Sequence, residues 1–90
     1  MSYQIVLKKS AQDHIIAHKR SGNVGLCRKI ENLLLELAEH PCEGTGKPEM
    51  LKGILTGYWS RRIDREHRLI YSIDDVSVTV CIISAKGHYE

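Results

Sequence analysis

The chain has 90 residues, a length that suits one domain with a single hydrophobic core. Hydrophobic residues make up 42% of it and charged residues 27%, which is typical of a globular protein and not of a disordered one. The formal net charge of +2 predicts only weak general attraction to nucleic acid or to an anionic membrane. We therefore expect one domain over residues 1–90, in which any nucleic-acid site depends on a local arrangement of side chains.

Neither a membrane span nor a disulfide framework is indicated. No apolar run approaches the roughly 18 residues of a membrane helix, and the first ten residues lack the pattern of a signal peptide. Cys27, Cys42 and Cys81 are odd in number and far apart, so we expect three reduced cysteines that serve in packing. The sequence predicts a soluble, cytoplasmic protein.

The histidines do not predict a metal site. Among the five, only His14 and His18 are paired, at i and i+4 on one face of a predicted helix, and no third ligand follows nearby. We expect this pair to form part of a solvated helix face, and we expect no metal ion.

The N-terminal part predicts a strand and then a helix. Apolar and polar residues alternate over residues 3–8, as in a strand with one buried face. Ser10 and Asp13 then have the spacing of a capping box, which predicts a helix from there to about Arg20.

A second helix follows the turn signal at residues 21–23. Its apolar positions have helical spacing and give the strongest periodic signal in the chain: Leu26, Ile30, Leu33, Leu34 and Leu37. The helix should end near His40, because Pro41 disfavours helical geometry in the residue before it.

The second half of the chain predicts three strands. A loop rich in Gly and Pro covers residues 41–49, strands are expected at 58–63 and 67–73, and a third at 76–85. The residues at 64–66 form the turn of the first hairpin. The order is therefore β-α-α-β-β-β, an α+β fold in which two N-terminal helices pack on a twisted antiparallel sheet.

Strand alternation sorts the side chains of this hairpin onto two faces. If the turn is centred on Arg65, one mainly apolar face pairs Trp59 with Tyr71, Arg61 with Leu69, and Ile63 with His67. The other face then places Arg62 directly across from Arg68. Like charges in that position are destabilising unless a group of opposite charge lies beside them.

Two kinds of anionic group could offset the repulsion between the paired arginines. A bound phosphate or a carboxylate would suit them, because arginine makes bidentate contacts with either group. Alternatively, Asp64 and Glu66 of the turn form an ion-pair patch with the arginines that has no role in binding.

A second group of polar residues has the composition of an acid–base site. Glu49 lies between Lys47 and Lys52, which should keep its carboxylate ionised and able to accept a proton. His88 and Tyr89 follow the last predicted strand. A carboxylate, two arginines, a lysine and a histidine together provide a base, a phosphate clamp and an acid.

These residues resemble a known family. The stretch "EGTGKPEMLKGILTGYWSRRIDREHRLIY" and the later "GHY" are similar to the Txe/YoeB toxins of bacterial type II toxin–antitoxin modules, which have the RelE-like fold. The likeness is close over residues 41–71 and at His88 and Tyr89, and the β-α-α order of the first 40 residues agrees with it.

The resemblance implies a function and a role for each site residue. It implies a metal-independent endoribonuclease without a cofactor, which cuts mRNA in the ribosomal A site and inhibits translation. Glu49 falls at the position of the general base, Arg68 at that of the transition-state arginine, and His88 at that of the general acid. The positions that orient substrate correspond to Lys52, Arg62 and Tyr89, with Lys47 beside them.

The resemblance also implies partners. These are a cognate antitoxin of the YefM or Axe kind, the ribosome with its mRNA, and operator DNA bound only through the antitoxin complex. Self-association as a homodimer is left open, and no membrane partner is expected.

Two other functions compete with RNA cleavage. A RelE-like fold can serve a non-enzymatic toxin that binds another target, such as a topoisomerase, because fold alone does not decide function. The presence of both Glu49 and His88 argues against this, since a binding module needs no acid–base pair. A DNA-binding arginine surface is the least favoured alternative, given the small net charge.

Overall fold

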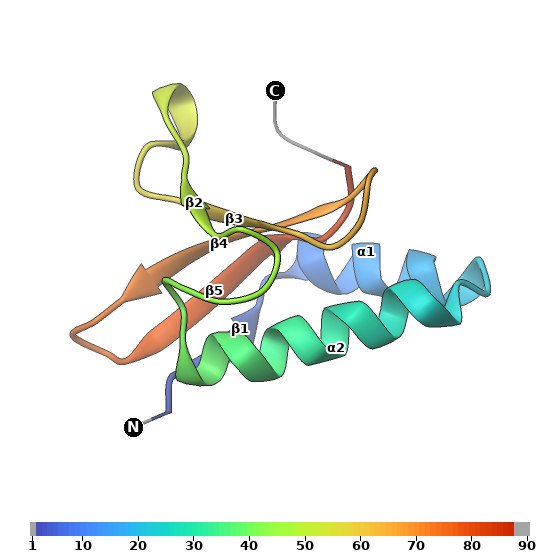
Figure 1. The fold of residues 1–90 in the computed structure, drawn as a ribbon, viewed down its shortest axis with the longest axis horizontal. Helices are drawn as coiled ribbons and strands as arrows, with labels where there is room; N and C mark the ends of the chain where they lie inside the picture. The colour runs from blue at the N-terminus through green and yellow to red at the C-terminus, as the bar shows by residue number, and fades with distance from the viewer. Residues whose placement is uncertain (1, 88–90) are drawn as a thin grey trace.

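The computed structural model describes residues 2–87 and shows two helices under one face of a five-stranded sheet (Figure 1). The elements follow in this order: β1 (Gln4–Leu7), α1 (Lys9–Arg20), α2 (Val24–Glu39), β2 (Glu49–Met50), the 3-10 helix η1 (Gly53–Leu55), β3 (Trp59–Arg62), β4 (Arg68–Asp74) and β5 (Thr79–Ser84). No helix within the described residues is long and apolar enough to cross a membrane.

The predicted α+β class is confirmed, with two differences in the sheet: the short strand β2 was not predicted, and one strand pair is parallel. The strand order is β1-β5-β4-β3-β2, and every neighbouring pair is antiparallel except β1 and β5, which are parallel. The sheet is therefore mixed. Alternation in the sequence identifies a strand but carries no information on the direction of its partner, and the partner of β1 is the last strand of the chain.

The two helices begin by different means. The predicted capping box at the start of α1 is wrong: Lys8 precedes the helix without a side-chain cap, and the Ser10 hydroxyl instead donates to the Ile83 carbonyl on β5 at 2.5 Å. In α2, the side chain of Asn23 accepts a hydrogen bond from the Leu26 amide at 3.1 Å, which is a standard N-cap. This helix ends before His40, as predicted.

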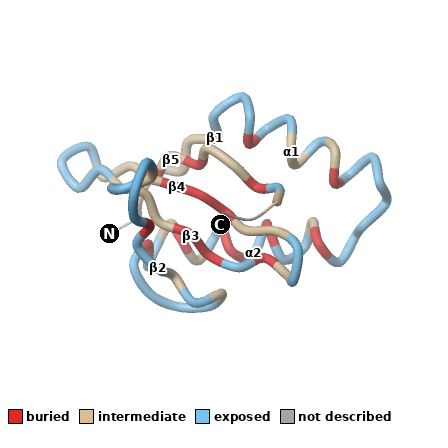
Figure 2. Tube along the Cα trace, turned by 90° about the horizontal axis from the view of Figure 1, so that it is seen from above, coloured by how far each residue is buried: buried red, intermediate tan, exposed pale blue. Residues whose placement is uncertain are grey.

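The core lies between the helices and the sheet. In Figure 2 the buried positions run along β4 and along the inner sides of both helices. The buried cluster includes Leu26, Ile30, Leu33 and Leu37 of α2, Leu69, Tyr71, Val80 and Ile82 of the sheet, and Ile63 directly after β3. All three cysteines are free, and Cys42 is exposed, so the prediction that each serves in packing is wrong for this one, which sits in the loop after α2.

A buried arginine fastens that loop to the sheet. Arg61 of β3 is fully buried, on the face of the hairpin that was predicted to be mainly apolar. Its five N–H groups donate to Glu36 Oε1 at 2.7 Å, the carbonyl of His40, the carbonyl of Glu43 at 2.6 Å, the carbonyl of Thr45 at 3.4 Å and the Tyr71 hydroxyl at 3.2 Å. Tyr71 donates in turn to the Pro41 carbonyl at 3.0 Å. The guanidinium thus ties the loop to α2, β3 and β4.

Two glycines allow the loop to lie so close. Gly44 has a φ of +117°, and a Cβ there would lie 1.8 Å from Glu36 Oε1. Gly46 has a φ of +85°, and a Cβ there would lie 2.6 Å from the carbonyl oxygen of Arg62. Any larger residue at Gly46 would meet backbone, so the loop needs glycine there both for its conformation and for space.

Candidate active site

The hairpin that carries the candidate site has the predicted register. Trp59 pairs with Tyr71, Arg61 with Leu69, and Arg62 with Arg68, all within the antiparallel ladder of β3 and β4. Because paired residues lie on the same face of a sheet, Arg62 and Arg68 share the face turned away from the helices, which we call the outer face.

On the outer face, Arg68 is bonded to the predicted general base. Its Nη1 lies 2.8 Å from Glu49 Oε1 and 2.9 Å from Ser60 Oγ. Glu49 reaches this position because β2 pairs with β3 and sets Glu49 opposite Ser60. Within residues 2–87, Nη1 is the only side-chain nitrogen of Arg68 with a protein acceptor, so Nη2 and Nε remain available for an anion.

The structure thus shows which carboxylate lies beside the paired arginines. The carboxylate that contacts Arg68 is Glu49, from a strand that the sequence did not predict. Asp64 instead shapes the turn, where its Oδ1 accepts the amide protons of Glu66 and His67 at 2.9 and 2.8 Å. Burial of Asp64 raises the pKa of this carboxyl, but the two amide bonds outweigh that effect and lower the pKa overall. Asp64 is therefore committed to the backbone, and the prediction of an ion-pair patch in the turn is wrong.

The other predicted substrate-binding residues lie around this pair. Arg62 is exposed and directly across from Arg68, and Lys47 and Lys52 are exposed on either side of β2. Lys47 has a φ of +51°, a left-handed conformation that is uncommon outside glycine. His88 and Tyr89 lie outside the described residues.

Gly87, the last described residue, is connected to the candidate site. The Arg68 amide donates to the Gly87 carbonyl at 2.8 Å, so the residue before His88 is held on the same strand as the guanidinium. This bond lies just beyond the β4–β5 ladder, in which Ile70 pairs with Ser84.

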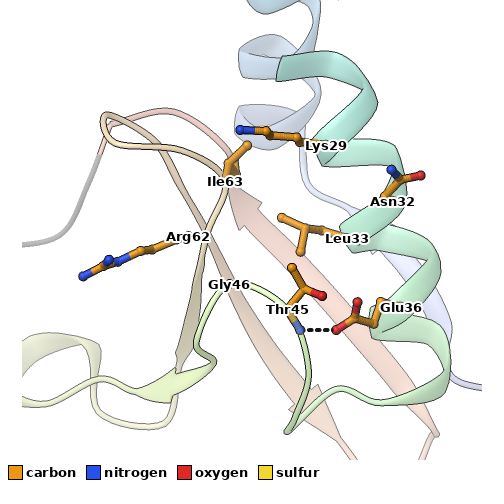
Figure 3. Close-up of a pocket in the computed structure, with 8 residues that line it drawn as sticks. All are labelled: Lys29, Asn32, Leu33, Glu36, Thr45, Gly46, Arg62 and Ile63. Carbon is orange, nitrogen blue, oxygen red and sulfur yellow. Dashed lines mark hydrogen bonds between the residues drawn. The ribbon is translucent and has the colours of Figure 1, made fainter. Parts of the chain in front are cut away.

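A cleft of about 420 Å³ occupies a different place. Lys29, Asn32, Leu33 and Glu36 of α2 line it together with Thr45, Gly46, Arg62 and Ile63 (Figure 3). In Figure 3 the Arg62 side chain points away from α2, toward the outer face. The cleft therefore lies on the helix side of β3, and it is separate from the Glu49–Arg68 pair.

Sequence reasoning missed several residues that organise the site. Ser60 is fully buried, and its hydroxyl orients Arg68. The prediction that His14 and His18 form a solvated face is wrong, because both rings turn inward and bond the main chain of Ala85. Their i, i+4 spacing was a signal that they share a face, but the sequence does not say which face meets β5. Within residues 2–87, no group of three or more His, Cys, Asp or Glu side chains is arranged to hold a metal ion.

Comparison with known proteins identifies the family. Residues 8–89 match the model of the YoeB-like toxin of bacterial type II toxin–antitoxin systems. Toxin RelK of Mycobacterium tuberculosis is 52% identical over 62 residues, which cover 69% of this chain and 71% of that protein. Toxin YoeB of Escherichia coli strain K12 is 44% identical over 64 residues, which cover 71% and 74%.

Solved structures agree in fold. A YoeB/ParE toxin from Agrobacterium tumefaciens has a TM-score of 0.88 at 35% identity and covers 96% of this chain and 99% of its own. The toxin of the YoeB–YefM complex from Staphylococcus aureus gives 0.82 at 39%, and the YoeB dimer from that organism 0.83 at 37%, each covering 99% of this chain and 100% of its own. The chain therefore belongs to the YoeB family of type II toxins.

Proposed function

We propose that the chain is an endoribonuclease that cuts mRNA in the ribosomal A site and thereby inhibits translation. The observation that carries the proposal is the cluster of Glu49, Arg68 and Ser60 on the outer face, in which Nη2 and Nε of Arg68 have no acceptor among residues 2–87. A carboxylate suits proton abstraction, and a guanidinium suits the oxygens of a phosphate. Both groups are already in contact on the outer face, where the Glu49 side chain is 56% exposed and that of Arg68 is 19% exposed.

The proposed reaction uses the ribose 2′-hydroxyl as nucleophile. Glu49 accepts its proton while the 2′-oxygen forms a bond to the adjacent phosphorus and the bond from phosphorus to the 5′-oxygen breaks. His88 protonates the departing 5′-oxygen. Arg68 stabilises the charge that builds on the phosphoryl oxygens. The products are a 2′,3′-cyclic phosphate and a free 5′-hydroxyl, and the need for a 2′-hydroxyl selects RNA over DNA.

The cationic residues around the pair position the substrate in this proposal. Arg62 lies across from Arg68, where a second guanidinium is well placed to share a phosphate. Lys47 and Lys52 flank β2 and contact the RNA backbone, while Tyr89 orients a base. The residues themselves need no metal ion or organic cofactor to carry out the proton transfers.

The proposed partners follow the family. A YoeB toxin from Staphylococcus aureus forms a complex with YefM, and a YoeB dimer from that organism has been solved. We expect this chain to bind a YefM-like antitoxin, to contact operator DNA only through that complex, and to act on ribosomes in the cytoplasm. A homodimer is the expected form of any self-association.

The test is cleavage of a defined mRNA on purified translating ribosomes. The parent protein should cut within the A-site codon, and Glu49→Gln and His88→Gln should each lose about 10²–10⁴-fold in rate, the usual contribution of a positioned base or acid. Glu31→Gln, an exposed carboxylate on α2, is the matched control and should cut like the parent. A message with a 2′-deoxy nucleotide at the cut site should resist all of them.

Two outcomes would contradict the proposed function. If Glu49→Gln and His88→Gln cut as fast as the parent, the assignment of base and acid is wrong. If the parent arrests growth while mRNA stays intact and supercoiling is blocked, the non-enzymatic alternative replaces this proposal.

A further inference from the structure

Three histidine rings converge on the main chain of residues 85–87. His14 and His18 come from α1, and His67 comes from the end of the turn that precedes β4. His14 Nδ1 lies 3.1 Å from the Ala85 amide nitrogen, and His18 Nε2 lies 2.8 Å from the Ala85 carbonyl oxygen. His67 Nδ1 lies 2.9 Å from the Gly87 amide nitrogen. We call these three side chains the histidine cradle.

The hydrogen-bond partners define the protonation of each ring. A main-chain amide can only donate, so Nδ1 of His14 and of His67 must carry no proton. A carbonyl can only accept, so Nε2 of His18 must carry one. His18 is buried, and its ring meets that of His67 edge to face at 4.7 Å between centroids. The cradle is thus a fixed arrangement of two acceptors and one donor.

The residue before His88 is held through both of its polar groups. The Gly87 amide donates to His67, and the Gly87 carbonyl accepts from the amide of Arg68 at 2.8 Å. Chain ends are usually poorly ordered unless they are tied down. Here Gly87 is bonded to Arg68 and to His67, the residue directly before Arg68. The anchoring of Gly87 and the placement of Arg68 are therefore linked.

We propose that His14, His18 and His67 are positioning residues, which hold Ala85 and Gly87 so that the chain presents His88 to the Glu49–Arg68 pair. This inference rests on the proposed function, in which His88 is the general acid. General-acid catalysis needs the donor within hydrogen-bond reach of the leaving oxygen, so loosening its anchor should slow the chemical step and leave binding almost unchanged.

Charge on the cradle would oppose its role. A proton on Nδ1 of His14 or His67 would set one N–H against another and break the bond to the chain. Burial lowers the pKa of His14, with further lowering by Lys86 and His18 and a small opposing effect of Asp13, so the acceptor form is favoured. Among residues 2–87, the titratable groups Asp64, Glu66 and His18 face His67.

The anchoring is tested by nuclear magnetic resonance on the full chain. An N–H···N hydrogen bond transmits a scalar coupling between its two nitrogens, so the parent should show couplings from Gly87 to His67 Nδ1 and from Ala85 to His14 Nδ1. The coupling to His14 should fade on acidification, because a proton on Nδ1 removes the acceptor. If neither coupling appears and both amides exchange as fast as free peptide, the cradle does not hold the chain.

The positioning role is tested by single-turnover cleavage on ribosomes. His67→Ala should cut at least about tenfold more slowly, since small misplacements of a reacting group cost up to about 10²-fold. His67→Asn keeps an acceptor near the place of Nδ1 and should recover to within about threefold of the parent. The ribosome concentration for half-maximal rate should stay the same in both. His14→Ala gives a second measurement if His67→Ala does not fold.

The control is His40→Ala, which removes an exposed imidazole that lies near Glu43 and makes no described contact with residues 84–87. If His67→Ala and His14→Ala cut as fast as His40→Ala, the positioning role is wrong even though the parent is active. If the parent shows both couplings but does not cut mRNA, the proposed function fails while the anchoring stands.

Discussion

Two arginine–carboxylate pairs occupy opposite faces of the same hairpin. Arg61 contacts Glu36 at 2.7 Å on the helix side, and Arg68 contacts Glu49 at 2.8 Å on the outer face. The distances match, but the surroundings differ. The side chains of the first pair are 0% and 27% exposed, and those of the second are 19% and 56% exposed.

The difference lies in how the remaining donors are used. Every N–H group of Arg61 is bonded to protein, in a place where water cannot substitute for a lost partner. Arg68 uses only Nη1 among the described residues. One guanidinium therefore holds a loop in place, and the other has two nitrogens, Nη2 and Nε, without an acceptor among residues 2–87. In the proposed function, the same chemical pair serves structure on one face and catalysis on the other.

The largest expected effect on stability comes from Arg61→Met. This change keeps an unbranched side chain but leaves the Glu36 carboxylate and several carbonyls without their donor, so the free energy of unfolding should fall by about 3–5 kcal/mol. Urea unfolding measures it. The matched control is Arg20→Met, which changes an exposed arginine at the end of α1 and should unfold like the parent. An equal loss in both variants would show that Arg61 has no special role.

Arg68→Gln should have the opposite effect to Arg61→Met: it should lower the cleavage rate and leave the stability almost unchanged. Loss of a donor aimed at the transition state typically costs about 10²–10³-fold in rate. The free energy of unfolding should change by about 1 kcal/mol or less, because Glu49 is largely exposed. Ribosomal cleavage and urea unfolding are measured together, with Arg65→Gln in the exposed turn as control. If Arg68→Gln lowers the free energy of unfolding but leaves the cleavage rate unchanged, Arg68 has a structural role and not a catalytic one.

Tyr71→Phe tests the support of the buried pair. The hydroxyl accepts from Arg61 Nε and donates to the Pro41 carbonyl, so its removal leaves two buried groups unpaired. We expect a loss of about 1–3 kcal/mol in the free energy of unfolding, with unchanged cleavage by the folded protein. Tyr58→Phe, directly before β3, is the control. If cleavage falls with stability intact, the two faces are not independent.

The smallest effect is the pH dependence of the buried pair. Burial raises the pKa of Glu36, but hydrogen bonds from Thr45 and the bond and charge of Arg61 outweigh it and lower the pKa below the ordinary 4.5. The unfolded chain then takes up a proton first as pH falls. The ionised Glu36 carboxylate therefore contributes to the free energy of unfolding above about pH 4.5, and this contribution is lost as the pH falls through the lower pKa of the folded state. Glu36→Gln should therefore unfold with a flatter pH dependence in this range.

Much of the outer face could be predicted from the sequence. The alternation over β3 and β4 and the short turn between them define the register, because a shift by one residue would bury the charged side. That placed Arg62 across from Arg68. The two-residue strand β2 had too short a pattern to recognise, so the contact between Glu49 and Arg68 appeared only in the structure.

The helix side was harder to predict for a physical reason. Arg61 alternates with apolar residues, and a charged residue in that position is buried only if the fold supplies acceptors. Those acceptors come from a loop whose path depends on two glycines and on α2, far away in sequence. The inward face of His14 and His18 likewise depends on how α1 packs on β5, which no local pattern contains.

The division of labour between the two faces is tested most directly by comparing Glu49→Gln with Glu36→Gln, for ribosomal cleavage and thermal unfolding in the same preparations. We predict that Glu49→Gln loses cleavage by about 10²–10⁴-fold and unfolds like the parent, whereas Glu36→Gln unfolds at a lower temperature and cuts like the parent while folded. Equal losses of cleavage in the two variants, at a temperature where both are folded, would contradict this division.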